Sequence, residues 1–253
     1  MLQRAFEVDH RGATIRGMSY CPTDERRCPA VLFLHSFTGQ RAESGFLFVR
    51  LARALVEEGI AAVTFDFRHS GESDGSFEQM LVTGELDDAL RMTQWLKGQL
   101  FADRTRLAIL GFSLGGLLAS CVQARTGAYV AMVMVAPTTT ENLSRFAGKK
   151  QNQAQVVLGP HTLHPDFFND LQTLDPVADV VEHPRPTLVI QGTADTAVPA
   201  GVSQQFVDAM KQANIPVTSH LVENADHVFG KLSVRQELIT SVRQWLGGEL
   251  GAV

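Results

Sequence analysis

A serine stands between two glycines in the stretch Gly111-Phe112-Ser113-Leu114-Gly115, which fits the pattern G-x-S-x-G. In that pattern the serine occupies a sharp turn between a strand and a helix, and the turn exposes its hydroxyl. A serine hydroxyl is a weak nucleophile that needs a base, and the base needs a third group to orient it. The stretch therefore predicts a nucleophilic serine if an acid and a histidine lie nearby. The alternative is a serine that only caps the N-terminus of a helix.

Candidates for the acid and the base follow two later strand-like runs. In folds with this turn the chain order is serine, then acid, then histidine. Asp195 lies in "QGTADTAVP" and is the preferred acid, while His227 lies in "VENADHVF" and is the preferred base because no other histidine follows the last predicted strand. Asp226 is a rival for the acid, but the side chain of a residue adjacent to the histidine points elsewhere.

An oxyanion hole needs two backbone N–H groups that point to one place. Leu114 follows the nucleophile at the start of a predicted helix, where the helix dipole favours negative charge. The second donor is expected from the loop "HSFTGQ", which follows the apolar run "AVLFLH", and Phe37 is the preferred residue.

The elements that must position these residues alternate along the chain. "RAFEVD" and "TIRGMSY" are joined by a turn and predict a hairpin. Continuous apolar runs then predict strands buried on both faces, at 30–35, 61–67, 106–112, 129–137, 187–192 and 217–223. Periodic apolar residues predict helices near 43–58, 83–100, 114–125, 200–213 and 232–246. Strands separated by helices predict an α/β fold, with a mostly parallel twisted sheet covered by helices on both faces.

One segment interrupts this alternation. Residues 138–185 hold no strong strand signal and are longer than a connection within a compact domain. An inserted cap over the carboxyl ends of the strands is the natural interpretation, because ligands bind at that edge of open α/β sheets. We therefore expect residues 1–253 to form a single domain with a cap at 138–185.

The cap supplies the candidate substrate-binding residues. Phe146, Phe167 and Phe168 are expected either to line an acyl pocket or to attach the cap to the sheet. His161 and His164 lie in "GPHTLHPDFF"; wall-forming or solvated histidines fit this pair better than metal ligands, because an H-x-x-H pair alone is weak evidence for a metal. His69, in the glycine-rich "DFRHSGESDG", is assigned to a structural turn.

Composition excludes several classes of protein. The 253 residues carry a formal net charge of −5, which gives no basic surface for nucleic acid. No apolar run is long enough to span a bilayer, and the N-terminal stretch lacks the apolar segment of a secretory signal. Cys21 and Cys28 could close a small loop if they were oxidised, but a reduced pair in a cytoplasmic protein is favoured. The oligomeric state stays open, with a homodimer among the alternatives.

Five motifs in order, "LHSFTG", "DFRHSGESDGSFEQM", "GFSLGG", "GTADTAVP" and "ADHVF", together resemble the α/β-hydrolase family. Within it they look most like small single-domain esterases of the cinnamoyl/feruloyl type. The resemblance implies that Ser113 is the nucleophile, Asp195 the acid and His227 the base, with Phe37 and Leu114 as oxyanion donors. It implies a small-molecule ester as substrate and no cofactor. Thioesters, acyl transfer and small peptides are alternatives with the same residues, and a hydrolase-like binding protein without activity is a further one.

The chain departs from the esterase pattern at two places. Ser36 replaces the glycine that this family usually has in the oxyanion loop, so the backbone of that loop is expected to differ. The segment 138–185 contains no tyrosine or tryptophan that could hold a phenolic hydroxyl. We therefore expect methyl ferulate and methyl cinnamate to be cleaved at similar rates, and short-chain esters to be preferred over long-chain lipids.

Overall fold

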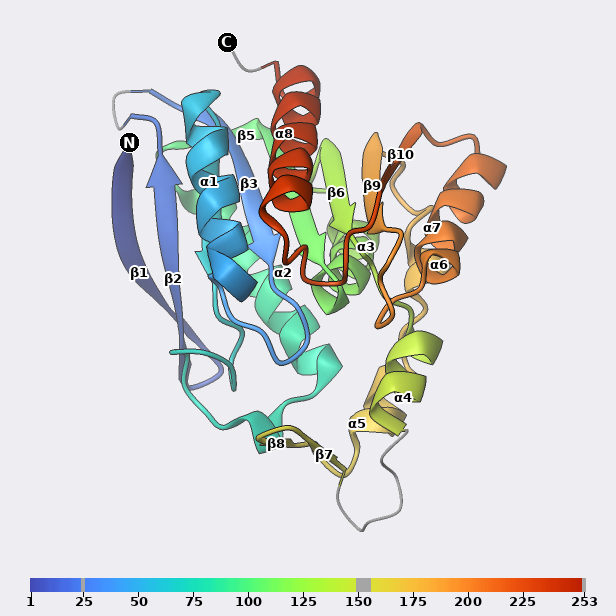
Figure 1. The fold of residues 1–253 in the computed structure, drawn as a ribbon. Coiled ribbons are helices and arrows are strands. Elements are labelled where there is room, and N and C mark those ends of the chain that lie inside the picture. The colour runs from blue at the N-terminus through green and yellow to red at the C-terminus, as the bar shows by residue number, and fades with distance from the viewer. Residues whose placement is uncertain (24–25, 149–155, 252–253) are drawn as a thin grey trace.

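The computed structural model describes residues 1–23, 26–148 and 156–251. These residues form an eight-stranded sheet in the order β1-β2-β4-β3-β5-β6-β9-β10 (Figure 1). Its strands are β1 (Leu2–His10), β2 (Ala13–Cys21), β3 (Cys28–Leu34), β4 (Ala61–Phe65), β5 (Ala102–Phe112), β6 (Ala131–Val135), β9 (Thr187–Gly192) and β10 (Val217–Val222). β2 pairs antiparallel with β1 and β4, and the other neighbouring strands pair parallel. The predicted hairpin and mostly parallel sheet are confirmed.

The central strands are buried along most of their length. β3, β4, β6 and β9 have no exposed residue, and the last six residues of β5 are buried as well. Parallel strands with helices on both faces have this character, because neither side of the sheet meets water. Each strand therefore contributes to two apolar cores, as Leu107 and Ile109 of β5 belong to one and Ala108 and Leu110 to the other.

Five long helices cover the two faces of the sheet. They are α1 (Leu47–Glu57), α2 (Val82–Gly98), α3 (Leu114–Thr126), α7 (Ala200–Gln212) and α8 (Leu232–Glu249). The apolar sides of α1 and α8 complete one core, in front of the sheet in Figure 1, while α2, α3 and α7 complete the other. The 3-10 helices η1 (Ser44–Phe46) and η2 (Phe77–Gln79) lie in loops. This arrangement confirms the predicted helices on both faces.

The segment after β6 contains only short elements. These are α4 (Thr140–Gly148), β7 (Val157–Leu158), β8 (His161–Thr162), α5 (Phe167–Leu171) and α6 (Pro176–Asp179). Part of the predicted cap, residues 149–155, lies outside the described residues. Figure 1 shows α4, α5 and the β7–β8 hairpin beyond the carboxyl ends of the parallel strands.

Cys28 and Cys121 are buried free thiols, and burial raises the pKa of the Cys28 thiol.

Among the described helices, none combines the length and the apolar character that crossing a bilayer requires.

Candidate active site

Ser113 lies in the turn that links β5 to α3. Its backbone angles are φ 55° and ψ −111°, a conformation that is costly for a residue with a side chain. The flanking glycines permit the turn, because a Cβ on Gly111 would lie 2.0 Å from the Gly115 carbonyl oxygen and one on Gly115 would lie 2.0 Å from the Leu34 carbonyl oxygen. The N–H of Ser113 donates to the Val135 carbonyl at 2.9 Å, which ties the turn to the neighbouring strand.

A chain of hydrogen bonds joins the three residues that the sequence singled out. Asp195 follows β9 and His227 follows β10, so both come from the same edge of the sheet as Ser113. Asp195 Oδ2 lies 2.7 Å from His227 Nδ1, and His227 Nε2 lies 3.1 Å from Ser113 Oγ. A carboxylate oxygen only accepts, so Nδ1 carries the proton and Nε2 is left to accept from the serine hydroxyl.

The surroundings of Asp195 fix its direction. The N–H groups of Ala197 and Val198 donate to Oδ1 at 2.9 and 2.8 Å. The Gln191 side-chain amide donates to Oδ2 at 3.1 Å and to the Val198 carbonyl at 2.9 Å. Sequence reasoning missed Gln191, although an amide at the end of the apolar run "TLVIQG" was a signal. Asp226, the rival acid, accepts instead from the Gly230 N–H at 2.7 Å.

The imidazole of His227 also has a defined neighbour. Its ring stacks on Phe112, with 5.2 Å between ring centroids and an interplanar angle of 30°. The side chain of His227 is 22% exposed, whereas that of Asp195 is fully buried. The pair is thus held on one side by the protein and open to a cavity on the other.

Of the two predicted oxyanion donors, Phe37 lines this cavity and Leu114 directly follows Ser113. Leu114 is the first residue of α3, where N–H groups have no partner within the helix. Ser36 and Phe37 line the cavity together with Ser113. Ser36 does not have a positive φ, whereas Thr38, two residues further on, has φ 57°. The loop therefore accommodates a serine at position 36 without the conformational freedom of glycine.

The cavity next to Ser113 has a volume of about 580 Å³, which is within the usual range for small-molecule sites. Its wall includes the loop at 36–46, the catalytic candidates Ser113 and His227, and Leu143 and Phe146 from α4. Asn142 of α4 donates from its side chain to Thr138 Oγ1 at 3.0 Å and to the Ala197 carbonyl at 3.1 Å. These bonds attach α4 to the loop that carries Asp195.

The five candidate substrate-binding residues separate in space. Phe146 lines the cavity and is 46% exposed, and the other four are not part of that lining. Phe167 is fully buried and packs on the ring of Phe37 at 5.4 Å and on that of Phe168 at the same centroid distance. This packing favours the second alternative for Phe167, attachment of the segment to the rest of the fold.

The two histidines of the segment lie away from Ser113. His161 packs against Phe77, with 4.4 Å between ring centroids, and lines a second groove that shares Thr38, Gly39 and Gln40 with the first cavity. His164 Nδ1 accepts from the Asp166 N–H at 3.1 Å. Their spacing did not indicate these positions because His161 lies in the short strand β8 and His164 in the loop after it, and not on one face of a helix.

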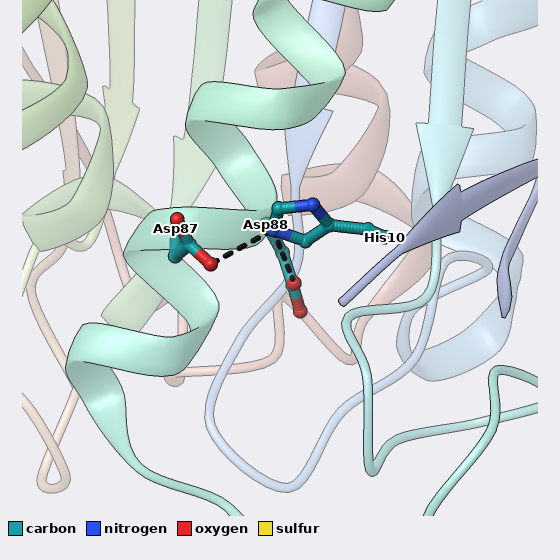
Figure 2. A group of neighbouring side chains, drawn as sticks. All are labelled: His10, Asp87 and Asp88. Atoms are coloured by element: carbon teal, nitrogen blue, oxygen red, sulfur yellow. Dashed lines mark hydrogen bonds and ion pairs between the residues drawn. The ribbon is translucent and has the colours of Figure 1, made fainter. Parts of the chain in front are cut away.

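A second histidine–aspartate cluster lies at the hairpin end of the sheet (Figure 2). His10 Nε2 lies 2.8 Å from Asp87 Oδ2 and 3.9 Å from Asp88 Oδ1. Donors of these types can bind a metal, but Arg11 pairs with Asp87, and Arg68 pairs with Asp88 at 2.5 Å. Two guanidinium groups thus already balance the two carboxylates. This cluster is an ion-pair network that ties the β1–β2 hairpin to α2.

The sheet topology and the position of the site at the carboxyl ends of its strands define the α/β-hydrolase fold, as the sequence motifs had indicated. Comparison with known proteins places it more narrowly. The model of the prolyl oligopeptidase family matches residues 48–252, and the chain belongs to that family.

The chain is also similar to individual proteins, two in structure and one in sequence. Est1E from Butyrivibrio proteoclasticus, solved with ferulic acid, superposes with a TM-score of 0.84 at 19% identity and covers 97% of this chain and 99% of its own. A puromycin-hydrolyzing peptidase from Mycobacterium tuberculosis superposes with a TM-score of 0.79 at 22% identity, covering 99% of this chain and 40% of its own. An uncharacterized 31.7 kDa protein from Escherichia coli is 33% identical over 95 residues. That match covers 38% of this chain and 32% of the relative, so the chain spans about a third of that relative's length.

Proposed function

We propose that this protein hydrolyses small carboxylic esters through an acyl-enzyme, with Ser113 as nucleophile, His227 as general base and Asp195 as the residue that orients the imidazole. The observation that carries the proposal is the unbroken chain of hydrogen bonds from Asp195 through His227 to Ser113 at the wall of a cavity. A serine that only caps a helix needs no such chain. The N–H groups of Phe37 and Leu114 are proposed as the oxyanion hole.

The geometry suits two successive acyl transfers. Ser113 Oγ attacks the ester carbonyl carbon while His227 Nε2 accepts its proton, and the carbonyl oxygen becomes an oxyanion that the two N–H groups stabilise. The imidazolium then donates its proton to the alcohol oxygen as the C–O bond breaks. A water molecule attacks the acyl-enzyme with the same base, which releases the acid and restores the serine. Asp195 keeps the proton on Nδ1 throughout and stabilises the imidazolium.

The cavity favours a short acyl or aryl group. Leu143, Phe146 and Val198 supply apolar surface close to the reacting serine, and apolar lining with few polar groups is typical of such pockets. Each methylene that is fully buried contributes about 0.8 kcal/mol, so efficiency should climb with acyl length until the cavity is full. Long-chain lipids are expected to be poor substrates, and methyl ferulate and methyl cinnamate to differ little.

Peptide or aminoacyl-amide hydrolysis is the second candidate. Membership of the prolyl oligopeptidase family favours it, as does the fold shared with a puromycin-hydrolyzing peptidase. The same residues serve both reactions, because only the leaving group differs.

A substrate panel separates the two candidates. We would measure kcat/KM for p-nitrophenyl esters of rising acyl length, beside methyl ferulate, methyl cinnamate and an aminoacyl p-nitroanilide. The esterase proposal expects the highest efficiency for acetate to hexanoate esters and little cleavage of the anilide. A higher efficiency for the anilide would support the peptidase instead, and turnover of both by Ser113→Ala would exclude the proposed site.

A further inference from the structure

Glu43 is a buried carboxylate in the wall of the cavity, and it serves neither as the base nor as the acid of the proposed reaction. The residue is 8% exposed and lines the same cavity as Ser113. In the described part of the chain no cationic side chain forms an ion pair with it. Burying a carboxylate without a cation is costly unless hydrogen bonds compensate.

Two backbone N–H groups supply those hydrogen bonds. Ser36 N–H donates to Glu43 Oε1 at 2.6 Å, and Ser44 N–H donates to Oε2 at 3.3 Å. The bond to Ser36 is short even for a charge-assisted N–H···O contact. Glu43 thus holds the loop that contains the proposed oxyanion donor Phe37.

The peptide group between Ser36 and Phe37 is held by hydrogen bonds to its carbonyl oxygen. The Ser36 carbonyl accepts from the Gly39 N–H at 2.9 Å, and His35 Nδ1 lies 2.9 Å from the same oxygen. His35 Nε2 accepts from the Phe67 N–H at 3.2 Å, which leaves the ring proton on Nδ1 to be donated. Burial lowers the pKa of His35, consistent with a neutral ring.

These bonds together fix the direction of one N–H group. In a trans peptide the carbonyl and the following N–H point in opposite directions. Holding the Ser36 carbonyl therefore aims the Phe37 N–H, provided that the backbone of Ser36 does not rotate. The Glu43 carboxylate prevents this rotation because it accepts a hydrogen bond from the Ser36 N–H, on the N-terminal side of that residue.

The backbone of Glu43 is itself strained. Its angles are φ 58° and ψ 168°, a region that is sparsely populated by residues other than glycine. Such strain persists where the surrounding structure enforces it, and it clusters at functional sites. A glycine at position 43 would relieve the strain but would remove the acceptor for Ser36.

We infer that Glu43 is a positioning residue whose carboxylate holds Ser36 so that the Phe37 N–H points at the developing oxyanion. The inference rests on the proposed ester hydrolysis at Ser113. It assigns Glu43 no contact with the substrate, and its effect is therefore expected in the transition state and not in substrate binding.

The test compares Glu43→Ala and Glu43→Gln with Glu57→Gln, a control at an exposed glutamate of α1. Rates are normalised to the fraction of chains that a fluorophosphonate labels. Removing one oxyanion donor costs about 10²–10³ in kcat, so a donor that is only misaligned in Glu43→Ala should cost about 10–100-fold. The glutamine keeps one acceptor but can serve only one of the two N–H groups, and its loss should be about 5-fold. KM should stay unchanged in both variants.

A second readout separates positioning from stability. A trifluoromethyl ketone forms a serine adduct whose oxygen is an oxyanion, so its affinity should fall by the same factor as kcat/KM in each Glu43 variant, and stay at the wild-type value in the Glu57 control. Unchanged kcat in Glu43→Gln, a rise in KM alone, or a lower melting temperature with an unchanged ketone affinity would each overturn the inference. If Glu43→Ala does not fold, Glu43→Gln decides the question. Wild-type protein that cleaves no ester would overturn the proposed function and, with it, this role. Active wild type with unaffected Glu43 variants would overturn the role alone.

Discussion

Two histidines of this molecule each lie within 3 Å of an aspartate, but their surroundings differ. His227 Nδ1 is 2.7 Å from Asp195, and His10 Nε2 is 2.8 Å from Asp87. Asp195 receives its other hydrogen bonds from uncharged amides, whereas Asp87 also pairs with the Arg11 guanidinium. A carboxylate that is already paired with a guanidinium stabilises an imidazolium less strongly.

The two imidazoles also differ in what else their nitrogens contact. His227 uses Nδ1 for Asp195, and its Nε2 faces a serine hydroxyl at the edge of a cavity, whereas the nitrogen of His10 that contacts Asp87, Nε2, also lies 3.9 Å from a second carboxylate, that of Asp88. A histidine–aspartate pair is thus a candidate base only when its second nitrogen faces a nucleophile and a substrate has room beside that nucleophile.

The largest effect is expected from the proposed nucleophile. Ser113→Ala removes the hydroxyl that His227 faces, and loss of a triad serine costs about 10⁴–10⁶-fold in kcat. The matched change at the other cluster, His10→Gln, should leave kcat within twofold of wild type. Initial rates with p-nitrophenyl acetate measure both, and circular dichroism checks the fold. Activity retained in Ser113→Ala would place the nucleophile elsewhere.

The two aspartates should differ almost as strongly. Asp195→Asn presents an amide to Nδ1, which favours the wrong imidazole tautomer and is expected to lower kcat about 10⁴-fold. Asp87→Asn should not change kcat, because Asp87 contacts no residue of the site. The same rate assay decides, with Asp226→Asn as a third variant. A greater loss in Asp226→Asn than in Asp195→Asn would make our choice of acid wrong.

An intermediate effect is expected from Gln191. Gln191→Met keeps the volume but removes the amide that donates to Asp195 Oδ2. Hydrogen bonds to charged groups contribute about 1.5–3 kcal/mol, and because the two backbone donors to Asp195 remain, kcat should fall by about 10-fold. Steady-state kinetics would show this as a change in kcat at constant KM. An unchanged kcat would mean that the two backbone N–H groups are enough to orient Asp195.

The substrate cavity allows a finer comparison between two phenylalanines of the segment. Phe146 lines the cavity and Phe168 does not, so Phe146→Ala should lower kcat/KM for the butyrate ester about 3-fold to 5-fold and for the acetate ester less, since about 0.8 kcal/mol is at stake per methylene. Phe168→Ala should change kcat/KM for the two esters by the same factor. A chain-length effect in Phe168→Ala and none in Phe146→Ala would reverse our description of the cavity.

The smallest expected effect concerns stability and not catalysis. Burial raises the pKa of Glu85 well above its usual value, and the nearby Asp88 adds to the rise. Between the ordinary glutamate pKa and this raised value the folded state binds more protons than the unfolded state, so stability falls as the pH increases. Glu85→Gln cannot lose a proton. The melting temperature of this variant relative to wild type should therefore be higher at pH 8 than at pH 5, and a difference that shrinks with pH would contradict this.

The sequence predicted the parts of the site that follow from local patterns. The turn at Ser113 is specified by glycines whose Cβ atoms would clash with backbone, and the buried parallel strands are specified by continuous apolar runs. Chain order then selected the loops of Asp195 and His227, because the carboxyl ends of parallel strands share one edge.

Residues whose roles depend on long-range contacts were not predictable. Glu43 acts on Ser36 through a bend of the loop that no periodicity reveals, and Gln191 reaches Asp195 only because the chain turns back after β9. In the segment 138–185 aromatic side chains are equally suited to a pocket or to packing. Only the tertiary contacts of Phe167 with Phe37 distinguish these alternatives.

The central claim is that Ser113, and not another serine, is activated by His227. The most direct measurement is labelling with a fluorophosphonate, followed by mass spectrometry of the tryptic peptides and by labelling rates in wild type, His227→Gln and His10→Gln. We predict a single adduct on Ser113, formed at least about 10²-fold more slowly in His227→Gln and at the wild-type rate in His10→Gln. An adduct on another residue, or equal labelling rates in the wild type and His227→Gln, would contradict the account.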